Sequence, residues 1–128
     1  MTEPIWLDVD DVIDIHAEQA AIFGGQEGVR DRAVLESAIS RPVDQWYSGQ
    51  TDLAALAAAY AFNLARNRAF LDANKRLAFQ AMVVFLRSNG IRFAPEPAHA
   101  TAIVLSLAAG EVSEASLTRW IRDNWPSE

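Results

Sequence analysis

One short stretch, residues 67 to 76, holds most of the polar chemistry of this chain: Asn-Arg-Ala-Phe-Leu-Asp-Ala-Asn-Lys-Arg. Lys75 can place a point charge on a phosphate, Arg76 can bind two phosphate oxygens with its planar fork, and Asn74 can donate from its amide. Asp72 is the carboxylate of the stretch. Proteins commonly hold Mg²⁺ with one or two carboxylates together with phosphate oxygens. The residue types therefore predict a site for a metal and a phosphate.

The position of these residues at a helix start strengthens the prediction. An apolar pattern runs from about residue 74 to 88, so the polar side chains lie at its N-terminus. The first backbone amides of a helix are unpaired and carry the positive end of the helix dipole, which attracts anions. Since this segment has almost no polar face, we expect a central helix buried on all sides.

A plainer interpretation of the same residues stays open. Asp72 can simply cap the helix, while Lys75 and Arg76 remain solvated charges of its first turns. Phe70 would then fill the core rather than border a ligand. Short polar clusters at helix starts are common, so the residue types alone do not decide between the two interpretations.

The rest of the chain predicts an all-α fold, a single domain over residues 1 to 128 with about six helices. We expect no strand, because alternation of apolar and polar residues persists nowhere. Pro42 should end the second helix, since proline has no amide proton and restricts the preceding residue. Trp46 and Tyr47 would then lie in a loop over residues 41 to 50 that borders a cleft. The predicted helices cover residues 8 to 24, 32 to 40, 51 to 66, 74 to 88, 98 to 109 and 114 to 124.

Composition and charge exclude several classes of function. A formal net charge of −6 opposes direct binding of nucleic acid, which depends on cationic side chains displacing counterions. The apolar runs are far shorter than the roughly 18 residues of a membrane span. The N-terminus lacks the pattern of a secretory signal, and the chain has no cysteine. We therefore expect a cytoplasmic protein without a membrane partner.

The stretch from Phe70 to Arg76 resembles the signature of the Fic/Doc family, which in its Doc branch reads roughly His-x-Phe-x-Asp-Ala/Gly-Asn-Lys-Arg. Lys75 stands where Fic proteins usually have glycine, and this marks the Doc side. The likeness extends over nearly the whole chain and implies a Fic/Doc-like fold. Further matching segments are Gly24-Gly25, Arg30-Asp31, Leu35-Glu36-Ser37-Ala38, Arg41-Pro42, residues 85 to 90 and Ala109-Gly110-Glu111.

The resemblance implies a toxin of a type II toxin–antitoxin system. Doc toxins transfer the γ-phosphoryl group of ATP to a threonine of elongation factor Tu and stop translation, whereas Fic proteins transfer a nucleotide moiety to a target hydroxyl. By this likeness Asp72 would hold Mg²⁺, and Asn74, Lys75 and Arg76 would bind the phosphates of ATP. The antitoxin would be Phd-like, with its C-terminal helix placed in a groove of this chain.

Arg68 occupies the position of the family's catalytic histidine, the base that takes the proton from the attacking hydroxyl. A guanidinium stays protonated at neutral pH and cannot accept that proton. Loss of a positioned general base typically costs on the order of 10²- to 10⁴-fold in rate. We therefore expect an inactive or attenuated toxin. The alternatives are a pseudoenzyme that binds nucleotide or antitoxin and a Fic-type transferase of AMP.

Arg68 is either a natural loss or an inactivating change in a toxin gene, and the intact remainder of the motif favours the second. The two histidines of the chain do not obviously replace the missing base. His16 lies on the apolar stripe of the first helix and is expected to be a core histidine, and His99 is expected to be exposed. With no second histidine near either, neither predicts a transition-metal site.

Overall fold

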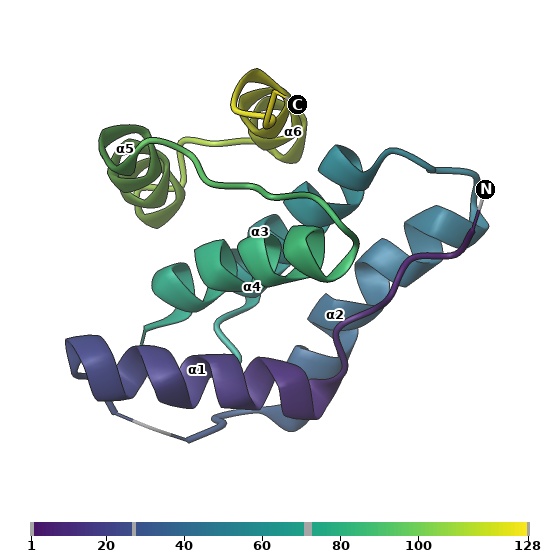
Figure 1. The fold of residues 1–128 in the computed structure, drawn as a ribbon. Coiled ribbons are helices and arrows are strands. Elements are labelled where there is room, and N and C mark those ends of the chain that lie inside the picture. Colours follow the sequence, from purple (N-terminus) through teal and green to yellow (C-terminus); the bar gives the residue numbers. More distant parts are fainter. Residues whose placement is uncertain (1, 27, 71–72, 128) are drawn as a thin grey trace.

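The fold is known from a computed structural model that describes residues 2–26, 28–70 and 73–127. These residues form six helices and no sheet, which confirms the predicted all-α fold (Figure 1). Within the described part of the chain, no helix has both the length and the apolar character needed to cross a membrane. The helices are α1 (Val9–Phe23), α2 (Arg32–Tyr47), α3 (Leu53–Asn67), α4 (Asn74–Ser88), α5 (Pro97–Ala108) and α6 (Glu114–Asp123).

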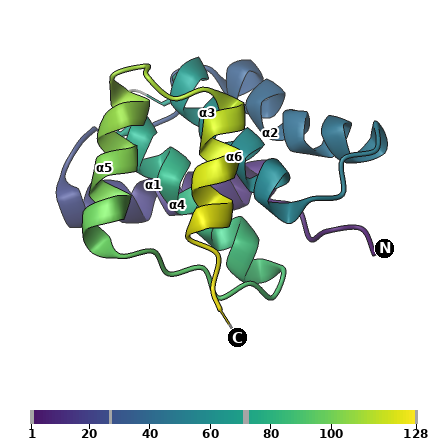
Figure 2. The same cartoon turned by 90° about the horizontal axis from the view of Figure 1, so that it is seen from above.

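The helices α3 and α4 form the centre of the fold. Figure 1 shows α1 on one side of this pair and α5 and α6 on the other, while α2 packs against α3. Seen from above, α5 and α6 run beside each other in front of α3 and α4 (Figure 2). This arrangement leaves the connection between α3 and α4 at one end of the central pair, close to the start of α2.

A buried central helix is present, but α3 fits that description better than α4. Ten of the fifteen residues of α3 are buried, seven of them alanines, and small side chains let neighbouring helices approach closely. In α4, eight of fifteen residues are buried, while Lys75, Arg76 and Gln80 remain partly exposed. The expectation that α4 is buried on all sides is therefore wrong, because its first turns border the molecular surface.

The helix α2 continues through Pro42, so the prediction that it ends at Ser40 is wrong. A proline inside a helix costs about 3 kcal/mol through its lost hydrogen bond and its steric clash. Burial offsets this cost: Pro42 lies in the core, and Trp46 in the last turn meets Trp6 edge to face at 6.4 Å between ring centroids. Tertiary packing thus turns the predicted aromatic loop into helix.

The segment before α1 is tied to the central pair. Asn89 accepts a hydrogen bond from the Ile5 backbone amide (2.8 Å) and donates one to the Ile5 carbonyl (3.0 Å). The Leu7 amide donates to the buried hydroxyl oxygen of Tyr60 on α3 (3.0 Å). Burial raises the pKa of Tyr60 to about 12. These hydrogen bonds hold the N-terminal segment against α3 and against the C-terminal end of α4.

Candidate phosphate-binding site

The connection between α3 and α4 begins and ends with left-handed backbone. Arg68, the C-cap of α3, has φ 49° and ψ 53°, and Ala73 before α4 has φ 63° and ψ 23°. They are the two residues other than glycine with positive φ in the described part of the chain. Left-handed geometry costs an L-residue about 1–2 kcal/mol, and such strain often accompanies functional sites.

The side chain of Asn74 braces this connection. It is 7% exposed, its Oδ1 accepts from the Phe70 amide and its Nδ2 donates to the Phe70 carbonyl, both at 3.1 Å. The loop before α2 adds support, since the Arg30 and Asp31 amides both donate to the Ala69 carbonyl (2.8 and 3.1 Å). These hydrogen bonds thus hold Ala69 and Phe70 against the start of α4 and against the loop before α2.

Phe70 fills the core behind the connection. Its ring stacks on the imidazole of His16 with centroids 4.0 Å apart and planes 12° from parallel. His16 is 2% exposed, which confirms the prediction of a core histidine, and His99 is exposed as expected. The buried position of His16 gives it no open path to a ligand, so it is a poor substitute for the missing base.

The motif residues surround one cavity of about 310 Å³, which we call the cationic pocket. Four of its lining residues carry a positive charge, and none of the described lining residues carries a negative one. A cavity lined by one sign of charge concentrates ions of the opposite sign. The cationic pocket is lined by Arg30, Arg68, Phe70, Ala73, Asn74, Lys75 and Arg76.

The structure therefore brings Arg68, Phe70 and three residues of the first turn of α4 to one cavity. Asp72, the predicted metal ligand, lies outside the described residues, and the Mg²⁺ site stays a prediction. No group of three metal-ligating side chains occurs in the part of the chain that is described. Trp46 lies in the last turn of α2, whereas Asp31 caps its start. At a rise of about 1.5 Å per residue, the two residues are roughly 20 Å apart along the helix. It does not border the cationic pocket.

Arg30 was not predicted as a residue of the site. The sequence marked it only as a match to the family pattern, because it lies almost forty positions before the motif. Its approach depends on the two backbone hydrogen bonds to Ala69 and on the single antiparallel bridge between Val29 and Phe70. Such pairing between distant loops has no local sequence signal.

Arg76 connects the cationic pocket to the surface of α1. Its Nη2 donates to the Gly24 carbonyl (3.0 Å), and its guanidinium carbon lies 5.6 Å from the centroid of the Phe23 ring. Its Nε is buried and has no hydrogen-bond partner. An unpartnered buried donor is costly, so a ligand that accepts a hydrogen bond from it would be favoured.

Arg76 also borders an apolar groove of about 300 Å³ between α1, α4 and α5. Phe23 and Leu105 on its two sides are 63% and 64% exposed. Exposed apolar side chains gathered around one groove, unlike scattered single ones, commonly mark a contact surface for another molecule. The remaining lining residues of the apolar groove are Gln19, Phe79, Gln80, Ala100, Thr101 and Val104.

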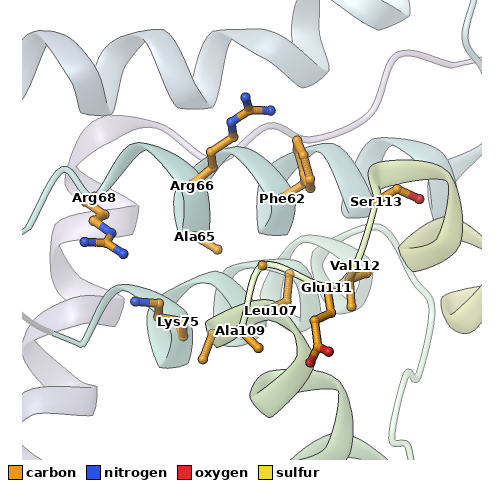
Figure 3. A pocket seen from close by; sticks show the side chains of 12 residues that line it. Phe62, Ala65, Arg66, Arg68, Lys75, Leu107, Ala109, Glu111, Val112 and Ser113 are labelled. Atoms are coloured by element: carbon orange, nitrogen blue, oxygen red, sulfur yellow. The ribbon is translucent and has the colours of Figure 1, made fainter.

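A larger cavity of about 610 Å³ adjoins the cationic pocket and shares Arg68 and Lys75 with it. It lies between α3 and the C-terminal end of α5, and we call it the α3/α5 pocket. In Figure 3, Arg68 and Lys75 lie together at one end of it, and Val112 and Ser113 lie at the other. The other lining residues are Phe62, Ala65, Arg66, Leu107, Ala108, Ala109, Gly110 and Glu111.

The fold and the site together define a small helical domain that presents a cationic pocket at the start of a central helix. The chain belongs to the Fic/DOC family, whose model matches residues 6–86, including the whole of the cationic pocket. The family assignment drawn from the motif is thereby confirmed.

Two relatives resemble the chain over most of its length. It is 32% identical to "Protein kinase doc" of Escherichia phage P1 over 114 residues, which cover 88% of this chain and 90% of that protein. It is 39% identical to "Toxin Doc" of Mycolicibacterium smegmatis over 98 residues, which cover 75% of this chain and 72% of that protein. The similarity thus favours the Doc branch.

Proposed function

We propose that this chain is a Doc-type toxin, a kinase by descent that is inactive or attenuated because of Arg68. In its active form it would transfer the γ-phosphoryl group of ATP to a threonine of elongation factor Tu and so block translation. The observation that carries the proposal is the cationic pocket, in which Lys75 and Arg76 lie beside the position of the family base. The similarity to a protein kinase and to a toxin of the same branch supports it.

The side chains of the cationic pocket suit the phosphates of ATP. Lys75, Arg30 and Arg76 supply positive charge, and the buried Nε of Arg76 supplies a donor without a partner. Phosphoryl transfer depends mainly on positioning and on stabilising charge, so a rigid cationic cavity is the main contribution a protein can make. Asp72 would hold Mg²⁺, which would neutralise phosphate charge when bound.

Asn74 contributes mainly by holding the backbone in place. Its carbonyl oxygen and one amide hydrogen are used by Phe70, which leaves the second amide hydrogen for a phosphate oxygen. The two hydrogen bonds therefore hold the Phe70 backbone against the start of α4, two residues after Arg68. Such preorganisation lowers the reorganisation needed in the transition state.

Arg68 lines both pockets, which supports a location of the family's base beside the phosphoryl group that would be transferred. A histidine can occupy this site, since it is one of the residues enriched in left-handed backbone. The exposed Arg68 side chain also packs against no core that histidine would disturb. We therefore expect Arg68→His to restore the base without a loss of folding.

The partner of the toxin would be a Phd-like antitoxin whose C-terminal helix fills the apolar groove. The exposed rings and methyl groups of Phe23 and Leu105 suit the apolar face of a helix. Binding there would reach Arg76, which borders both the apolar groove and the cationic pocket.

The test is growth and translation in cells that lack the antitoxin and express this chain or its Arg68→His variant at matched levels. We expect arrest with histidine only. Arg68→Gln is the matched control, because it removes the charge without supplying a base, and it should leave growth unaffected. Growth with soluble Arg68→His protein would contradict the proposal.

Two alternatives predict different outcomes of related measurements. A pseudoenzyme that binds nucleotide or antitoxin would not respond to Arg68→His, but Lys75→Ala would weaken its ligand binding. A Fic-type AMP transferase would label the target from ATP that carries the isotope on the α-phosphate, whereas a kinase would label it only from the γ-phosphate. The position of Lys75, where Fic proteins usually have glycine, favours the kinase.

A further inference from the structure

The side chain of Arg68 borders the cationic pocket from the α3 side. Arg68 and Lys75 are the two residues that line both the cationic pocket and the α3/α5 pocket. In Figure 3 the guanidinium of Arg68 and the ammonium of Lys75 point toward each other. Arg68 is exposed and Lys75 is half-buried, so both charges are accessible to a ligand that enters the cationic pocket.

The cationic pocket gathers positive charges that the described part of the chain does not neutralise. Neither Arg30, Arg68 nor Lys75 forms an ion pair with a carboxylate of the described residues. The Nε of Arg76 is buried and has no hydrogen-bond partner. Like charges that share a cavity repel one another, and an anion that enters relieves this repulsion. The arrangement therefore favours a ligand with several negative charges.

A guanidinium at position 68 changes what this pocket can bind. An imidazole is mostly neutral above pH 7, so a histidine at this position would leave three charged side chains around the cavity. Arg68 adds a fourth that stays charged, and its planar fork matches two phosphate oxygens. Hydrogen bonds between charged groups are roughly twice as strong as neutral ones. Arg68 is thus suited to neutralise phosphate charge, as divalent cations do in many phosphate sites.

We propose that Arg68 is a phosphate ligand and that it allows the cationic pocket to bind a polyphosphate chain in the absence of a divalent cation. The inference rests on the proposed function in one respect, since both place phosphates in the cationic pocket. It goes further because it gives the residue that replaces the base a binding role of its own. The chain would then hold a polyphosphate tightly without transferring a phosphoryl group from it.

The experiment measures the affinity for tripolyphosphate by titration calorimetry at neutral pH, first with EDTA and then with Mg²⁺. In EDTA we expect Arg68→Gln and Arg68→His each to weaken binding by at least about tenfold, the size of a lost hydrogen bond between charged groups. Arg68→Lys keeps the charge but not the fork, and its affinity should fall between those of the unaltered chain and Arg68→Gln. Circular dichroism and thermal unfolding establish that each variant is folded.

Arg66→Gln is the matched control, because it removes another exposed arginine from α3. Arg66 lines the α3/α5 pocket but not the cationic pocket. We expect its removal to change the tripolyphosphate affinity by less than about threefold, since an exposed charge without direct contact is screened by salt. Equal losses for Arg66→Gln and Arg68→Gln would reflect long-range charge alone and would overturn the proposal.

Mg²⁺ and ATP provide two further measurements. Mg²⁺ should strengthen tripolyphosphate binding by Arg68→His clearly more than binding by the unaltered chain, in which Arg68 already neutralises phosphate charge. Binding by the unaltered chain that requires Mg²⁺ would overturn the proposal. In EDTA, Arg68→Gln should weaken the binding of ATP and of tripolyphosphate by the same factor. A loss restricted to ATP would place Arg68 on another part of the nucleotide and would also overturn the proposal.

These measurements distinguish failure of the inference from failure of the proposed function. If Arg68→His arrests growth but binds tripolyphosphate in EDTA as tightly as the unaltered chain, Arg68 is not a phosphate ligand and the proposed function stands. If the folded, unaltered chain binds neither tripolyphosphate nor ATP, with or without Mg²⁺, the phosphate site is absent. Both the inference and the proposed function are then refuted.

Discussion

Removal of the Asn74 carboxamide should destabilise the whole domain, because it takes both hydrogen bonds from the Phe70 backbone. Each bond is 3.1 Å long and buried. A buried hydrogen bond contributes about 0.5–1.5 kcal/mol net, and a buried group left unpaired costs about 1–3 kcal/mol. With two backbone groups affected, we expect Asn74→Ala to lose about 2–4 kcal/mol of unfolding free energy. At roughly 4 °C per kcal/mol for a chain of this size, the melting temperature falls by about 8–16 °C.

Urea denaturation followed by circular dichroism measures this loss. The matched control is Asn63→Ala on α3, since the half-buried Asn63 makes one side-chain hydrogen bond, to the Ala59 carbonyl at 2.8 Å. The control should lose at most about 1 kcal/mol. Equal losses for the two variants would refute the conclusion that Asn74 holds the connection, as would an unchanged stability of Asn74→Ala. Tripolyphosphate affinity should fall in Asn74→Ala only, because only that variant loosens the cationic pocket.

Two further predictions concern the left-handed cap and the buried tyrosine. Arg68→Gly should raise the unfolding free energy by up to about 1 kcal/mol, because glycine adopts φ 49° without strain. The control Arg66→Gly, inside α3, should lower the unfolding free energy by about 1 kcal/mol. A lower urea midpoint for Arg68→Gly would contradict the conclusion that Arg68 is strained. Burial raises the pKa of Tyr60 from 10.0 to about 12, so the folded state favours the neutral phenol. The corresponding contribution to stability, about 3 kcal/mol, is complete below pH 10 and is lost as the pH rises to 12. Absorbance at 295 nm with urea denaturation between pH 8 and 12 measures this, and Tyr60→Phe should lack that part of the pH dependence.

The sequence alone determined the helical class and the location of the candidate site. Spacing of apolar residues gave α1, α3, α4, α5 and α6 close to their observed bounds, because each helix buries one face or more. The motif from Phe70 to Arg76 marked the cationic pocket, since its residues are contiguous and lie on one loop and one helical turn. Local chemistry of this kind is visible in a sequence.

Tertiary structure decided the features that depend on contacts between distant segments. Pro42 lies inside α2 because burial of Pro42 and Trp46 outweighs a local preference to end the helix. Arg30 reaches the cationic pocket through backbone hydrogen bonds to Ala69.

The α3/α5 pocket depends on tertiary structure in the same way, since Phe62 and Glu111 are separated by almost fifty positions. They line one cavity because α5 packs on the central pair. The spacing of apolar residues indicates which face of each helix is buried. Which helices pack against each other depends instead on the summed packing energy of the whole fold. The sequence therefore located the cationic residues of the candidate site, and only the folded chain placed the surfaces around them.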